Sequence, residues 1–91
     1  MGREVRSFKS KERKSRQEVS DFLRQLADKI SEGQVLLRQG QQELSLELPA
    51  NLVLEIQVED EEKRSKGTQH SLEVEIKWYD NDDDGGVLEL G

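Results

Sequence analysis

Hydrophobic residues recur at helical spacing between residues 16 and 32. Their positions follow i, i+3, i+4, i+7, i+8 and i+11, and the residues are Val19, Phe22, Leu23, Leu26, Ala27 and Ile30. Polar side chains fill the remaining positions, so the segment is predicted to form one amphipathic helix. Ser15 and Glu18 have the spacing of a capping box at its start. Gly33 stands where a left-handed glycine commonly ends a helix.

After Gly33 the hydrophobic period changes to two. Val35 and Leu37 begin the alternation, and a turn is expected at residues 39–41. Three further alternating runs follow, with apolar positions at Leu44, Leu46 and Leu48, at Leu52, Leu54, Ile56 and Val58, and at Leu72, Val74, Ile76 and Trp78. Such alternation predicts strands of a sheet with one dry and one wet face.

The links between these strands indicate how they are connected. Residues 39–41 and 49–51 are short, turn-forming links, and short links favour antiparallel neighbours. Residues 60–69 are charged and contain Gly67, which predicts a loop before the final strand. We therefore expect an α+β fold, with one amphipathic helix packed on an antiparallel β-meander of about four strands. A short strand over residues 3–8 is left open as an addition to that sheet.

Composition limits what this fold can be. With 32% hydrophobic and 37% charged residues the chain approaches the disordered range, but its ordered periodicity favours folding. The 91 residues suffice for one domain, which we place at residues 1–79, followed by a flexible acidic tail at residues 80–91. The chain has no cysteine, which rules out disulfides and thiolate metal sites and favours a cytoplasmic location. Its apolar runs are short, so neither a signal peptide nor membrane insertion is expected.

Charge is unevenly distributed along the chain. Residues 1–38 carry ten Lys or Arg against six Asp or Glu, whereas residues 39–91 carry four against fourteen. These oppositely charged ends either keep a small domain soluble or steer partners toward it. The basic cluster at residues 9–16 could contact phosphates, but the expected wet face of the sheet is acidic and would repel a nucleic-acid backbone. Nucleic-acid binding is therefore not expected.

The order of these segments is also that of a known family. A capped helix with VSDFLRQLAD at residues 19–28 precedes Gly33, a leucine-alternating strand, Leu48-Pro49 and the closing segment LEVEIKW at residues 72–78. This order resembles the amphi-Trp domain, a small prokaryotic domain named for a Trp in a strongly amphipathic strand. EIKW at residues 75–78 is its most distinctive part. The resemblance covers residues 3–79, leaves out the segment after Tyr79, and implies a fold and a prokaryotic source but no activity.

No group of residues supports a catalytic site. His70 is the single histidine, and the sequence shows no partner that would position it as a general base. No serine lies in a nucleophile elbow, and the glycines are too scattered for a phosphate-binding loop. We therefore expect neither enzymatic activity nor a cofactor.

The acidic tail offers an alternative chemistry. Asp80, Asp82, Asp84 and Gly85 match the first half of a calcium-binding loop, in which oxygen ligands alternate before a turn glycine. The twelfth position of such a loop holds a bidentate glutamate, and here it is Gly91. A bound metal is therefore not expected, and a small ligand- or divalent-ion-binding protein that uses this tail is the alternative function.

The remaining candidates are surfaces for a protein partner. Trp78 is expected on the dry face, either packed in the core or exposed as a binding anchor, and Tyr79 on the opposite, exposed face. The residues predicted to bind a partner are Trp78, Tyr79, Glu55, Glu73 and Glu75. The outer strands of a meander leave unpaired edges, so a weak homodimer through such an edge is expected. The sequence thus favours a non-enzymatic interaction module and does not identify its partner.

Overall fold

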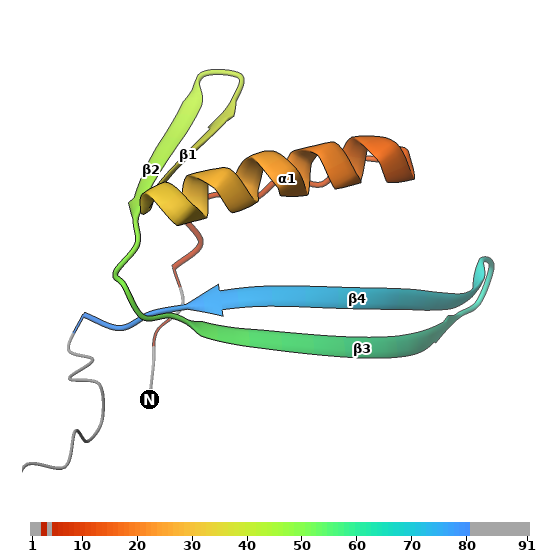
Figure 1. Ribbon diagram of the computed structural model, residues 1–91. Coiled ribbons are helices and arrows are strands. Elements are labelled where there is room, and N and C mark those ends of the chain that lie inside the picture. Colours follow the sequence, from red (N-terminus) through yellow and green to blue (C-terminus); the bar gives the residue numbers. More distant parts are fainter. Residues whose placement is uncertain (1–2, 4, 81–91) are drawn as a thin grey trace, which may run out of the picture. The chain divides into compact units, whose positions relative to one another are not determined.

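The computed structural model describes residue 3 and residues 5–80 of the chain (Figure 1). These residues form one helix, α1 (Arg16–Glu32), and four strands, β1 (Gln34–Gln39), β2 (Gln42–Glu47), β3 (Val53–Lys63) and β4 (Gly67–Lys77). Every strand pair is antiparallel, so the predicted α+β class is confirmed. The chain divides into two compact units, Met1–Leu48 and Pro49–Gly91.

The boundaries of α1 agree with the prediction from the sequence. Ser15 is the N-cap: its hydroxyl accepts a hydrogen bond from the Glu18 amide at 3.1 Å, and the Glu18 carboxylate accepts one from the Ser15 amide at 3.1 Å. At the other end Gly33 adopts a left-handed conformation with φ +87°, and its amide donates to the carbonyls of Lys29 and Ile30. The capping box and the terminal glycine thus satisfy backbone groups that a helix leaves without intrahelical partners.

Replacing Ser15 with alanine should test the capping box. The Glu18 amide would lose its acceptor, and we expect a loss of about 1 kcal/mol in the free energy of unfolding. Chemical denaturation followed by circular dichroism measures this change. Ser31→Ala, at an exposed position in the last turn of α1, serves as the control. Equal destabilisation by the two substitutions would contradict the role of Ser15 as the cap.

The first unit is built around the junction of α1 with the β1–β2 hairpin. Val35 is only 5% exposed and lies opposite Leu46 in the hairpin. The Gly33 carbonyl accepts a hydrogen bond from the Leu48 amide at 2.8 Å, which extends the backbone pairing beyond the hairpin. Val35 is the single buried apolar residue in the described part of the chain, so the core of this unit is very small.

The segment before α1 is not a strand where the structure describes it. Among residue 3 and residues 5–8 no backbone pairing is assigned, so the additional strand left open by the sequence is not formed there. Instead the Ser7 carbonyl accepts a hydrogen bond from the Gln42 side-chain amide at 3.1 Å. This is a single side-chain hydrogen bond, whereas strand pairing would require a series of backbone hydrogen bonds.

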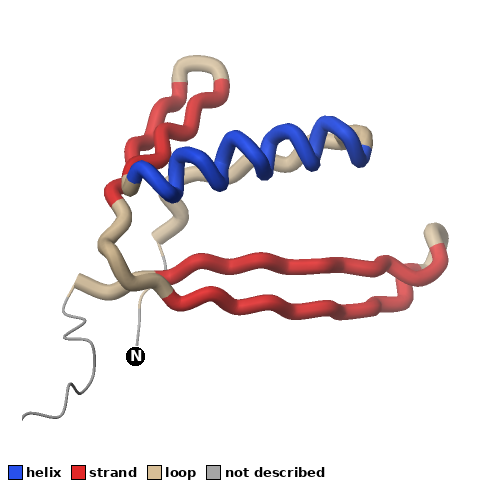
Figure 2. Tube along the Cα trace, in the orientation of Figure 1, coloured by secondary structure: helices blue, strands red, loops and turns tan. Residues whose placement is uncertain are grey.

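The second unit is a long hairpin of β3 and β4, each with eleven residues (Figure 2). The pairing runs from Val53 opposite Lys77 to Lys63 opposite Gly67. The predicted loop over residues 60–69 is therefore wrong, because only residues 64–66 lie between the strands. Both faces are polar near this turn, so hydrophobic alternation gives no sign of strand there, although backbone pairing continues.

The predicted single meander is not confirmed. β1 pairs with β2 and β3 pairs with β4, and within the described residues the strands form two two-stranded sheets. Residues 48–52 separate the hairpins, and Pro49 among them has no amide hydrogen to donate to a ladder. The hydrophobic period predicted all four strands, but it contains no information on whether consecutive hairpins pair with each other.

Candidate functional site

The β3–β4 hairpin carries an uninterrupted set of apolar side chains on one face. Residues directly opposite each other in an antiparallel pair lie on the same face, as do alternate residues along each strand. Three successive rungs on this face are therefore apolar, and they are the pairs Leu54–Ile76, Ile56–Val74 and Val58–Leu72. We call these six residues the apolar ladder.

Most of the apolar ladder is exposed. Five of its six side chains are between 56% and 72% exposed, and Ile76 is partly buried. Burying the exposed parts of five such side chains is worth on the order of 5–10 kcal/mol in gross transfer free energy. An isolated two-stranded hairpin is at best marginally stable in water, and a contiguous exposed apolar patch commonly marks an interaction surface. The ladder is therefore the strongest candidate for a binding site.

The opposite face of the hairpin is acidic. Glu55 lies directly opposite Glu75, and Glu73 lies opposite Gln57 on the same face. The three glutamates predicted to bind a partner are thus brought together on one face. Lys77 partly neutralises them: its Nζ is 3.6 Å from Glu55 Oε2 and 3.5 Å from Glu75 Oε1. The charges of Glu55 and then Glu75 raise the pKa of the Lys77 ammonium above its ordinary value.

A polar pair follows the apolar ladder on the same face, toward the turn between β3 and β4. Asp60 lies opposite His70 on the ladder face, and the His70 Nδ1 is 2.7 Å from Asp60 Oδ1. Both side chains are exposed. The sequence placed these residues in or beside a loop and therefore missed the contact, which only the register of the long hairpin reveals. In the described residues the pair has no third group with which to act as a catalytic triad.

Two aromatic residues follow the open end of the hairpin. Tyr79 is 61% exposed, as predicted, whereas Trp78 is partly buried. Together with Ile76 and Lys77 they line a shallow hollow of about 280 Å³. One end of the hairpin thus brings together an apolar ladder residue, a cation and two aromatic residues, which are Ile76, Lys77, Trp78 and Tyr79.

The family model for the Amphi-Trp domain matches residues 1–90. The chain belongs to the amphi-Trp domain family. The match includes the acidic segment after Tyr79, which the resemblance in the sequence left out. No curated protein and no solved structure matches the chain. In this amphi-Trp domain the Trp stands directly after an amphipathic strand, β4, as the family name indicates.

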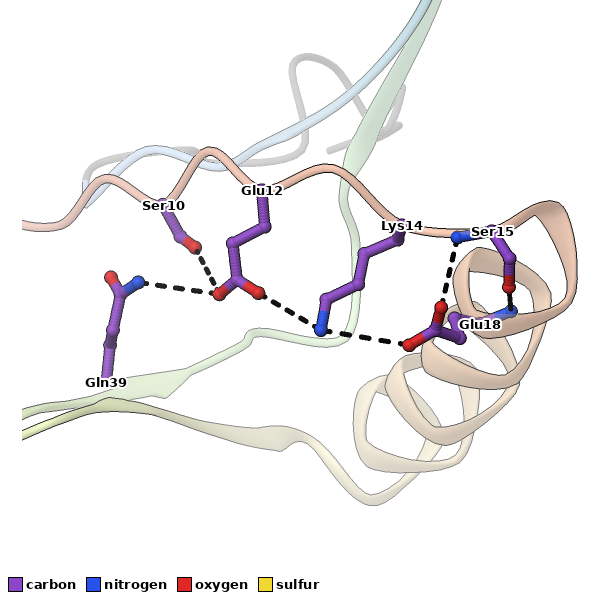
Figure 3. A network of polar contacts seen from close by, with 6 residues as sticks. All are labelled: Ser10, Glu12, Lys14, Ser15, Glu18 and Gln39. Atoms are coloured by element: carbon purple, nitrogen blue, oxygen red, sulfur yellow. Dashed lines mark hydrogen bonds and ion pairs between the residues drawn. The ribbon is translucent and has the colours of Figure 1, made fainter.

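A cluster of polar side chains lies at the N-terminal end of α1 in the amphi-Trp domain (Figure 3). Lys14 Nζ is 3.1 Å from Glu12 Oε2 and 3.9 Å from Glu18 Oε2. Glu12 also accepts hydrogen bonds from Ser10 and from Gln39 at the end of β1. The hydrogen bond with Glu12, together with the charges of Glu12 and Glu18, raises the pKa of the Lys14 ammonium. The cluster therefore links the N-terminal segment to the capping box and to β1.

This cluster borders an open hollow of about 540 Å³, which also includes Val19 and Phe22 of α1. The Lys14 ammonium and the Glu12 and Glu18 carboxylates already contact one another, so their charges are matched within the first unit. The arrangement accounts for one cation of the basic cluster at residues 9–16 without a phosphate ligand. Its evident role is structural, because it supports the start of α1.

The capping box should make the stability of the amphi-Trp domain depend on pH. The pKa of Glu18 lies below its ordinary value of 4.5, first because the Ser15 amide donates to the carboxylate, then through the Ser15 side chain and Lys14. A lowered folded-state pKa means that ionised Glu18 stabilises the fold above the unfolded-state pKa. This contribution disappears as the pH falls through the folded-state pKa.

A comparison with Glu18→Gln isolates this contribution. The wild type should have the higher melting temperature at neutral pH, and the difference should shrink as the pH is lowered to about 3. Thermal denaturation of both proteins across this range measures the effect. A difference that stays constant from neutral pH to about 3 would show that the charge of Glu18 does not act through the cap.

The candidate calcium ligands of the acidic tail are Asp80, Asp82 and Asp84, and whether they bind a metal ion stays untested. Asp80 lies in an exposed turn, whereas Asp82 and Asp84 lie outside the described residues. Within the described part of the amphi-Trp domain, no three His, Cys, Asp or Glu residues gather as a metal ion requires. In the same residues no helix has the length and apolar character of a membrane span.

Proposed function

We propose that this amphi-Trp domain is a non-enzymatic protein-interaction module that binds through the β3–β4 hairpin. The observation that carries the proposal is the apolar ladder, in which three consecutive cross-strand pairs are apolar and largely exposed. The ladder is bounded by the Asp60–His70 pair at one end and by Trp78 and Tyr79 at the other. An apolar centre with polar and aromatic residues at its border is the usual composition of a protein-binding surface.

The acidic face gives the hairpin a preferred orientation toward a partner. Glu55, Glu73 and Glu75 lie on the face opposite the ladder, so a partner can cover the ladder without burying these carboxylates. Leaving them in water avoids the large cost of desolvating an unpaired charge. Charges that stay outside the buried part of an interface contribute to selectivity and association rate more than to affinity.

A matched pair of substitutions tests the module. Ile56→Glu places a charge in the middle of the ladder, and Gln57→Glu places the same charge one position away on the acidic face. We expect proteins that the wild type retains from a native lysate, including further copies of the chain, to be lost with Ile56→Glu and kept with Gln57→Glu. Tagged wild-type and variant chains, with mass spectrometry of the bound proteins, provide the measurement.

Circular dichroism must first show that both variants keep the strand content of the wild type. If the wild type retains no protein, the proposed function is wrong. If both substitutions reduce binding equally, the ladder is not the binding surface.

A further inference from the structure

Among the described residues, β4 has backbone pairing with β3 alone. In the described residues β3 and β4 form a two-stranded sheet, so each strand pairs on one side only. The unpaired amides and carbonyls of such an edge are a template for another strand. Two strands are too few for a sheet to be stable alone, whereas three or more with an apolar face suffice. The edge of β4 is therefore a place where a further strand would complete the unit.

The side chains of β4 are complementary to a second, antiparallel copy of the same strand. Suppose that Ile76 lies on a two-fold axis, directly opposite Ile76 of the second copy. Val74 then lies opposite Trp78 of the second copy, and on the other face Glu75 lies opposite its Lys77, and each of these pairs occurs twice. At the centre of this register apolar residues meet apolar residues on the ladder face, and opposite charges meet on the acidic face. Leu72, at the border, would lie opposite Asp80 of the second copy.

The registers centred on Val74, Glu75 or Lys77 place like charges opposite each other, and the edge of β3 lacks this match. With Glu75 on the axis, the apolar residues also align and Glu73 lies opposite Lys77, but Glu75 would lie opposite Glu75 of the second copy. With Val74 on the axis, Glu73 would lie opposite Glu75 of the second copy, and this repulsion would occur twice. The acidic face of β3 has no cation before Lys63, so no self-pairing of β3 offers an opposite-charge pair while keeping its apolar residues aligned. The match also requires the strand to continue through Trp78, which follows β4 directly.

We propose that a second copy of this chain binds along the β4 edge, antiparallel and centred on Ile76. The two hairpins then form one four-stranded sheet in the order β3–β4–β4–β3, with both apolar ladders on the same face. This proposal rests on the proposed function and names the partner of the module. This sheet differs from the four-stranded meander expected from the sequence, because it contains β3 and β4 of two chains and neither β1 nor β2.

Charge reversal on the full-length chain tests the pairing. In the proposed register Lys77→Glu places a carboxylate opposite Glu75 of the other copy, and Glu75→Lys places an ammonium opposite Lys77 of the other copy. Each repulsion occurs twice in a dimer, so each variant alone should dimerise about tenfold or more weakly than the wild type. An equimolar mixture of the two should restore dimerisation, because each heterodimer contains only opposite-charge pairs. Glu59→Lys, on the acidic face of β3, is the control and should dimerise like the wild type.

Sedimentation equilibrium gives the dissociation constants, and circular dichroism checks that each variant is folded. A disulfide provides a second measurement, since the chain has no cysteine of its own. Residues opposed across an antiparallel pair have Cα atoms about 4.5–5.5 Å apart, which suits a disulfide. Oxidation of Ile76→Cys should therefore give a covalent dimer in high yield, and Leu54→Cys on β3 should not.

A wild-type chain that stays monomeric at high micromolar concentration would overturn the proposal. So would single variants that dimerise like the wild type, or a mixture in which dimerisation is not restored. Failure here is distinguishable from failure of the proposed function. If the chain is monomeric but still retains another protein in an Ile56-dependent manner, the module stands and its partner is a different protein. If it is monomeric and retains nothing, both proposals are wrong.

Discussion

Val35→Asp should unfold the first unit. Val35 is 5% exposed and lies where β1 meets α1, so a carboxylate at this position would be buried without a cation. An unpaired buried charge costs several kcal/mol, and this unit has no other buried apolar residue in the described chain to offset the loss. We expect the helical circular dichroism signal to be largely lost at room temperature.

Leu36→Asp is the matched control for this substitution. Leu36 is the next residue in β1, is 43% exposed and lies opposite Ser45. The same carboxylate there remains in contact with water, so the helical signal and the melting temperature should change little. If both substitutions unfold the unit equally, the burial of Val35 is not what holds α1 against β1.

Gly33→Val should destabilise the same unit by about 2 kcal/mol or more. Gly33 has a φ of +87°, a conformation that a β-branched residue adopts only with strain. An added Cβ would make an ordinary contact, 3.8 Å from its nearest neighbour, the Leu48 carbonyl oxygen. We therefore expect the strain of the backbone to be the main cause of the loss.

Gly33→Asn separates backbone strain from side-chain bulk. Asparagine tolerates the left-handed conformation, so this variant should retain most of the stability that Gly33→Val loses. Urea denaturation of the three proteins gives the comparison. If asparagine and valine are equally destabilising, bulk near Leu48 and not the conformation of residue 33 decides the outcome.

The parts of the fold that depend on residues close together in the sequence could be predicted from it. Ser15, Glu18 and Gly33 define α1 because caps are made by residues within a few positions of the helix end. The alternation from Leu72 to Trp78 predicted a strand with one apolar face for the same reason. The outer half of the hairpin could not be predicted in this way, because Asp60 and the residues after it are polar on both faces.

The candidate site shows the same division. Glu73 and Glu75 could be placed on one face from their spacing alone, as alternate residues of one strand. The contacts of Lys77 with Glu55 and of His70 with Asp60 depend on the register between two strands. That register follows only once the turn is known to occupy residues 64–66. The turn could have been located from Gly67, because a glycine midway between two alternating segments indicates a hairpin turn.

Both hairpins pair strands that are adjacent in the sequence, and this has a consequence for how quickly the chain folds. The most distant paired residues, Val53 and Lys77, are only 24 positions apart. Contacts between nearby residues form early, and a hairpin typically forms within about 1–10 μs. Each hairpin should therefore sample its native pairing long before two chains meet by diffusion at micromolar concentration. The rate-limiting step of pairing between chains would then depend on protein concentration.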